Sequence, residues 1–112
     1  MKLSEITKTL NPLAEITEGR EKMQISDLYG KTATVDAFMI ATDESGKDYA
    51  VVHCKEYPNY FHFGGTMETK ILKLIEGDTE ATNEFKQTGI KLHYSLGRTK
   101  QNQNFTVVSI EQ

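Results

Sequence analysis

The sequence changes from a strand pattern to a helix pattern within residues 60–77, YFHFGGTMETKILKLIEG. Tyr60–Phe63 are all aromatic or imidazole residues, which favours a short extended segment ended by the two glycines that follow. From Thr66 onward, apolar residues recur at helical spacing, and Gly77 provides a C-terminal stop. A strand that leads directly into a helix is therefore predicted, with Glu68 on the solvent side of that helix.

Four more strands and a second helix are predicted on either side of this segment, because runs of β-branched and aromatic residues alternate with turn-forming residues. The first strand is long and bent, and its early part, residues 25–30, ends at Gly30. The expected strands are residues 22–41, 48–55, 60–63, 90–96 and 105–110, and the second helix covers residues 79–87.

Five strands with a helical insert between the third and the fourth are typical of the OB-fold. We therefore predict a mainly-β protein with a five-stranded OB-fold Greek-key barrel over residues 22–112. Residues 1–21 are predicted to form an N-terminal helical segment packed on the barrel, or a helix that binds a partner. Pro12 either breaks this helix or starts a second turn after Asn11.

Composition narrows the functional classes. Hydrophobic residues make up 38% of the 112 residues and charged residues 26%, which excludes a disordered chain. No apolar run approaches the ~20 residues of a transmembrane helix, and no secretory signal is visible after Met1. The single cysteine, Cys54, fits a reducing compartment, so a cytoplasmic protein is expected.

Charge is distributed unevenly along the chain. The net charge of −3 counts against nucleic acid as a partner. Residues 90–105, however, contain three basic side chains and no acidic one, namely Lys91, Arg98 and Lys100. A local concentration of positive charge is what binding to phosphates requires.

Strand alternation sorts the side chains into a core face and an outer face. The residues assigned to the core are Ala50, Val52, Cys54, Phe61, Phe63, Ile90, Leu92, Tyr94 and Leu96. The predicted outer face is aromatic, imidazole and cationic, and consists of Tyr49, His53, Lys55, Tyr60, His62, Lys91 and His93. Neighbouring turns add Lys47, Arg98 and Lys100. Such a surface can stack bases and follow phosphates, although a slip of one residue would exchange the two faces of a strand.

Other chemistry receives no support from the sequence. The three histidines lie too far apart in sequence to form a metal-binding motif, and Cys54 is interpreted as a small core residue. Gly64 and Gly65 precede a helix without the lysine of a phosphate-binding loop. We therefore predict no catalytic residue, no metal site and no cofactor.

Several of these segments together resemble a known family. Residues 49–52, 60–65 and 91–108 are similar to those of small single-stranded DNA-binding proteins carried by phages and mobile elements of low-GC Gram-positive bacteria. The resemblance implies an OB-fold, sequence-independent protection of single strands during replication or recombination, and a homo-oligomer. The chain departs from that family in having no tryptophan, and Ser109–Gln112 do not match its acidic tail.

The sequence supports two hypotheses of function. The first is a protein that binds single-stranded DNA, with RNA as a possible ligand and a dimer or tetramer as the assembly. The second is an accessory module of a phage or mobile element that binds proteins and has no affinity for nucleic acid. The acidic net charge favours the second reading, and the aromatic and cationic outer face favours the first.

Overall fold

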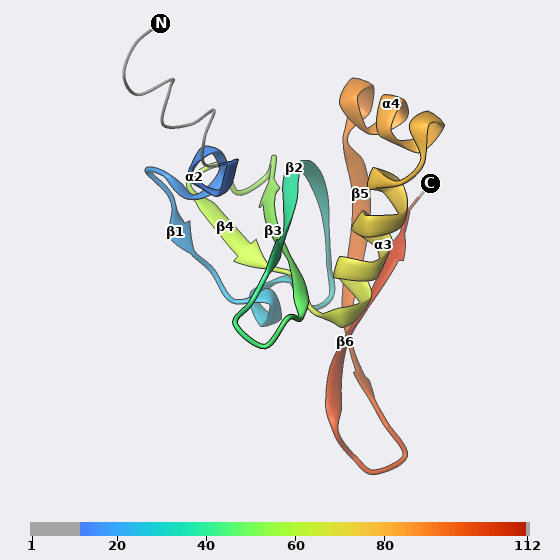
Figure 1. Ribbon diagram of the computed structural model, residues 1–112. Coiled ribbons are helices and arrows are strands. Elements are labelled where there is room, and N and C mark those ends of the chain that lie inside the picture. Colours follow the sequence, from blue (N-terminus) through green and yellow to red (C-terminus); the bar gives the residue numbers. More distant parts are fainter. Residues whose placement is uncertain (1–11, 112) are drawn as a thin grey trace, which may run out of the picture.

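A computed structural model describes residues 12–111 of the protein, which form one mixed β-sheet with helices packed against it (Figure 1). In chain order the elements are α2 (Pro12–Thr17), β1 (Glu21–Lys22), the 3-10 helix η1 (Ile25–Leu28), β2 (Lys31–Thr42), β3 (Asp48–Cys54), β4 (Tyr60–Phe63), α3 (Thr66–Glu76), α4 (Thr79–Thr88), β5 (Ile90–Arg98) and β6 (Asn104–Ile110).

The strand β2 is shared between the two halves of the sheet. Its first half, residues 31–35, pairs with β5, and its second half, residues 35–42, pairs with β3. A bulge at Asp36 interrupts the pairing with β3 directly after Val35, the residue that pairs with both neighbours. The Glu56 carboxylate accepts hydrogen bonds from the amide (2.7 Å) and the hydroxyl (2.8 Å) of Thr34, just before the bulge. A bulge bends a strand locally, which lets β2 turn from one partner to the other.

The sheet remains open, in contrast to the predicted barrel. The strands lie in the order β1-β4-β3-β2-β5-β6, so β1 and β6 are edges with no hydrogen-bonded closure between them among the described residues. The mainly-β class is confirmed, but there are six strands rather than five. The additional strand, β1, pairs in parallel with β4, and Ile25–Leu28 form a 3-10 helix instead of the start of the long strand.

The predicted helical insert between the third and fourth long strands is confirmed. The α3 helix ends at Gly77, as expected. The next helix, α4, is capped by Asp78, whose side chain accepts a hydrogen bond from the amide of Ala81 at 2.9 Å. It ends at Gly89, where φ is +69° and the amide donates to the carbonyl of Phe85. A Cβ atom at position 89 would also lie only 2.8 Å from the carbonyl oxygen of Val35. The positive φ and this close approach both require glycine at this position.

The core lies on the face of the sheet covered by α3. The predicted core positions of Ala50, Val52, Cys54, Leu92 and Tyr94 are confirmed, since all five belong to this core. Leu96 was wrongly assigned to the core: it is 47% exposed, because it lies where the β5–β6 hairpin extends past α3. The core is completed by Leu28, Ala33, Val35, Leu72, Ile75 and Val108. Burying branched and aromatic side chains of this kind supplies most of the stabilisation of a small domain.

The N-terminal part of the described chain packs on the opposite face. The α2 helix begins at Pro12, which agrees with a turn that starts after Asn11. It contacts β2, β3 and β4 and buries Ile16 (Figure 1). The rest of the predicted N-terminal segment, residues 1–11, lies outside the described residues. No helix within residues 12–111 is long and apolar enough to cross a membrane.

Candidate nucleic-acid interface

The faces of β4 are the reverse of those predicted. Val51 lies opposite Phe63 and Val52 lies opposite His62 in the β3–β4 pairing. Because directly opposed residues share a face, His62 joins the core with Val52. Its side chain is 1% exposed, whereas Phe63 is 38% exposed. The assignment of His62 to the outer face, and of Phe61 and Phe63 to the core, was therefore wrong.

The corrected outer face contains three aromatic rings in contact. The ring of Phe63 lies 5.5 Å from that of Tyr49 and 5.8 Å from that of Phe61, both in edge-to-face geometry. The ammonium group of Lys22 sits 4.8 Å from the centre of the Phe63 ring. We call Tyr49, Phe61 and Phe63, with Lys22, the aromatic strip. This cation–π contact holds the Lys22 ammonium group beside a half-exposed ring.

A groove of about 400 Å³ lies beside the aromatic strip, lined by Lys47, Tyr49 and Phe63 and also by Asp43 and Asp48. Both carboxylates have partners. Hydrogen bonds from the Ser45 hydroxyl and the Lys47 amide keep the pKa of Asp43 below its usual value. A 2.5 Å contact with the Lys73 ammonium lowers the pKa of Asp48.

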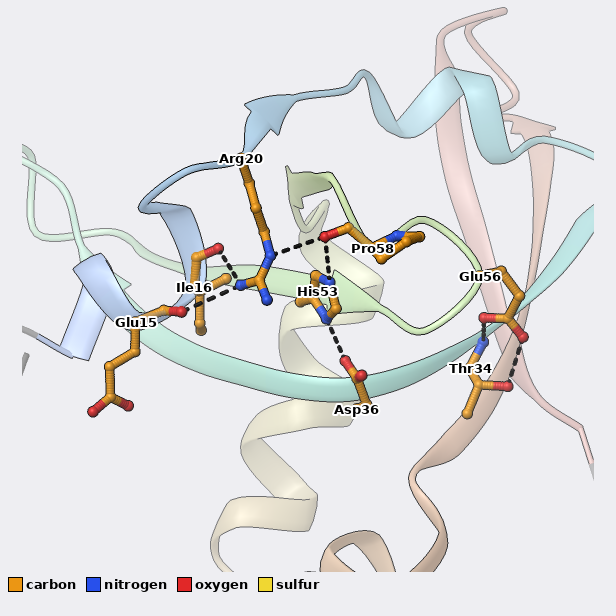
Figure 2. A network of polar contacts seen from close by, with 8 residues as sticks. All are labelled: Glu15, Ile16, Arg20, Thr34, Asp36, His53, Glu56 and Pro58. Atoms are coloured by element: carbon orange, nitrogen blue, oxygen red, sulfur yellow. Dashed lines mark hydrogen bonds and ion pairs between the residues drawn. The ribbon is translucent and has the colours of Figure 1, made fainter.

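His53 is also unavailable to a ligand, contrary to prediction. It is 6% exposed and lies beneath the segment that leaves α2 (Figure 2). One ring nitrogen contacts the Asp36 carboxylate at 2.5 Å and the other contacts the carbonyl of Pro58 at 3.2 Å. The Arg20 guanidinium donates to the same Pro58 carbonyl and to the carbonyl of Ile16. These contacts tie α2 to the bulge of β2, so His53 has a structural role.

His62 belongs to a polar cluster inside the core. Its Nε2 lies 2.8 Å from Oε1 of Glu68, which is fully buried rather than facing water as predicted. The His62 ring also meets the Tyr94 ring at 5.8 Å. Among the buried atoms of the described chain, Glu68 Oε2 and the Tyr94 hydroxyl have no hydrogen-bond partner. Burial and the nearby Glu68 charge raise the pKa of Tyr94, so the phenol stays protonated.

The remaining predicted site residues are dispersed. Lys47 and Tyr49 lie together at the groove. Tyr60 is exposed, but alternation places it on the side of His62, away from the aromatic strip. Lys91 lines another groove with Phe85 and Ile110, and half-buried His93 bonds Thr32 at 3.1 Å. The exposed residues Lys55, Arg98 and Lys100 lie after the end of β3 and on the β5–β6 hairpin, which projects from the sheet (Figure 1).

Lys22, Phe61 and Phe63 are the residues that the sequence analysis missed. Alternation within β4 carries no polarity signal, because both alternating sets contain aromatic rings. Lys22 reaches Phe63 only because β1 pairs with β4, and a two-residue strand leaves no periodic pattern. The helix does contain one usable signal. Glu68 is spaced four and seven residues from Leu72 and Ile75, which places it on their buried face.

The buried thiol makes stability sensitive to alkali. Burial first, and then the negative charges of Glu68 and Glu56, raise the pKa of Cys54 from 9.0 to about 12. Within residues 12–111, no cluster of His, Cys, Asp and Glu is arranged to hold a metal ion. Because its pKa is raised, the Cys54 thiol stays protonated at neutral pH and packs as a core residue.

We predict that the stability of the protein falls as the pH rises above about 9. The folded state holds the thiol proton more tightly, so this contribution is complete below the unfolded pKa and is lost between about pH 9 and 12. At pH 10.5 Cys54 alone should account for about 2 kcal/mol. Urea denaturation at pH 8 and pH 10.5 measures the loss. If the Cys54→Ala variant lost as much free energy of unfolding between pH 8 and pH 10.5 as the wild type, the loss could not be assigned to this thiol.

Comparison with protein-family models, with curated proteins and with solved structures finds no match to the chain, so the geometry of the described residues carries the functional argument.

Proposed function

We propose that the protein binds single-stranded DNA without sequence preference and performs no chemistry on it. The observation that carries this proposal is the aromatic strip with Lys22 above Phe63 and Lys47 in the adjoining groove. Every base has a face that can stack on an exposed ring, and every nucleotide carries a phosphate for a cation. Rings and cations on one surface therefore suit a single strand of any sequence.

The topology supports an OB-type architecture as part of the same proposal. A bent strand shared by two neighbours, as β2 is by β3 and β5, accompanies a helical insert before β5. Both features are typical of the OB-fold, which binds oligonucleotides across its second and third long strands. These strands correspond to β3 and β4, which carry the aromatic strip. We further propose a cytoplasmic homo-oligomer that protects single strands in replication or recombination.

Fluorescence anisotropy of a labelled oligo-dT tests this function. Binding in the micromolar range or tighter is expected at low salt, with weaker binding at higher salt and much weaker binding to duplex DNA. An oligo-U probe of the same length measures any preference between DNA and RNA. Equal affinity for duplex and single strand, or no affinity at low salt, would contradict the proposal.

Replacing Lys47 by alanine should reduce the salt dependence of binding. Lys47 lines the groove beside Tyr49 and Phe63, so loss of one phosphate contact should lower the slope of log K against log salt by about one. Lys91→Ala provides the matched control, since that exposed lysine lines a different groove. A slope changed equally by both substitutions, or by neither, would remove Lys47 from the interface.

A second candidate function is an accessory module that binds another protein. It is favoured by two exposed apolar side chains, Leu74 (75% exposed) and Ile110 (49% exposed). Both line a groove between α3, α4 and β6. Apolar side chains grouped in this way mark protein interaction sites in many domains. This function predicts no salt-dependent affinity for oligo-dT, so the anisotropy titration separates the two candidates.

A further inference from the structure

A second groove continues from the aromatic strip on the other side of Gly65. It has a volume of about 430 Å³ and lies between the start of α3 and the start of β6. Its lining residues are Gly65, Thr66, Met67, Lys70, Phe105 and Thr106. Gly65 and Thr66 also line the groove beside Tyr49 and Phe63. The two grooves therefore adjoin each other at these two residues.

The second groove has the same chemical character as the aromatic strip. Phe105 is 42% exposed and Met67 is 40% exposed, so both apolar residues are partly open to solvent. Lys70 adds an exposed cation, and none of the lining residues is acidic. The position of Met67 is fixed, because its sulfur accepts a hydrogen bond from the amide of Val108 at 3.1 Å. This groove is thus apolar, cationic and held in place by the edge of β6.

Gly65 lies where the two grooves meet and has room for a side chain. A Cβ atom at this position would meet only the side chain of Thr106, at 3.8 Å, which is ordinary contact. The backbone of Gly65, with φ −74° and ψ −175°, suits any residue. Gly64 differs, because a Cβ there would approach Glu68 Oε1 to 2.9 Å. A side chain can therefore be added at position 65 to narrow the passage between the grooves without displacing the core.

We infer that the Phe105 groove is a second binding subsite for the same nucleic-acid strand, taking a base against Phe105 and Met67 and a phosphate at Lys70. The inference rests on the proposed function and names the path of the strand, from the aromatic strip across Gly65 to β6. The adjoining position of the two grooves and the positive charge of Lys70 favour this occupant. Bases stack on exposed rings in a sequence-tolerant way, which suits a path built from separate rings.

Anisotropy titrations of Phe105→Ala and Gly65→Val with an oligo-dT of about 15 nucleotides test the subsite. The Phe105→Ala variant should bind oligo-dT about 5- to 150-fold more weakly, because one stacked base is lost. The Gly65→Val variant should also bind more weakly, because the valine side chain narrows the passage between the grooves. Leu96→Ala is the matched control, because Leu96 is 47% exposed on the same hairpin and does not line the groove. Circular dichroism establishes that each variant is folded.

The results separate the subsite from the proposed function. Weakening by both variants, with Leu96→Ala close to wild type, is the expected outcome. Wild-type affinity in Phe105→Ala and Gly65→Val, alongside weakened binding in Phe63→Ala, would overturn the subsite and leave the function standing. If Leu96→Ala weakened binding as much as Phe105→Ala, the subsite would also be overturned, because the effect would then come from the hairpin as a whole. No binding by wild type would overturn the function itself.

Discussion

Replacing His62 by leucine should destabilise the protein by about 3–5 kcal/mol, because the buried Glu68 carboxylate loses its 2.8 Å contact with the imidazole. His62 and Glu68 are 1% and 0% exposed, so water cannot replace the lost contact. A small domain is stable by only about 5–15 kcal/mol in total. Urea denaturation at pH 7 should therefore show a large decrease in the free energy of unfolding for His62→Leu.

The double variant His62→Leu, Glu68→Met distinguishes loss of the pair from loss of volume. An apolar pair of similar size is often as stable as a buried polar pair. The double variant should therefore be more stable than His62→Leu alone, which gives a large coupling energy in the double-mutant cycle. Additive effects of the two single substitutions, or a loss below about 1 kcal/mol for His62→Leu, would show that the contact contributes little.

Replacing Phe63 by alanine should weaken binding to oligo-dT by about 1–3 kcal/mol, with little effect on stability. Phe63 contacts both Tyr49 and Phe61 and lies under Lys22, so it is the centre of the aromatic strip. Its side chain is 38% exposed, and its removal should leave the main core intact. Anisotropy titration gives the affinity, and urea denaturation gives the stability of the same variant.

Tyr60→Ala is the matched control for Phe63→Ala. Tyr60 belongs to the same strand and is 40% exposed. Alternation along β4, however, places its side chain on the opposite face from the aromatic strip. Its substitution should leave the affinity for oligo-dT within about twofold of wild type. If Tyr60→Ala weakened binding and Phe63→Ala did not, the strand would bind the other face of β4.

Two kinds of segment carry strong local signals, namely a strand with regular alternation and helices with clear ends. The β5 strand alternates apolar with polar residues, and the structure buries Leu92 and Tyr94 as expected. The two helices of the insert have clear ends, at Gly77 and Gly89, and their bounds were predicted closely. In these segments one local pattern agrees with one packing face, so residue type alone determines the structure.

The β4 strand had no such signal, because its four residues are all aromatic or imidazole. Its orientation is determined by a contact across the core, in which His62 meets Glu68 from α3. Closure of the sheet could not be predicted either, since pairing between the edges depends on curvature along the whole of β2. The aromatic strip depends on this orientation of β4 and on the pairing of β1 with β4, which brings Lys22 to Phe63. Most of the fold was therefore predictable, while most of the candidate interface was not.

The most direct test of the central claim uses the absence of tryptophan from the chain. Phe63→Trp places a single tryptophan in the aromatic strip, and Leu74→Trp places one on α3, where the side chain is 75% exposed. Oligo-dT should quench the emission of Phe63→Trp, with recovery on addition of salt and no change with duplex DNA. Leu74→Trp should not respond. Unchanged emission from Phe63→Trp with excess oligo-dT, or equal quenching at both positions, would contradict binding at this face.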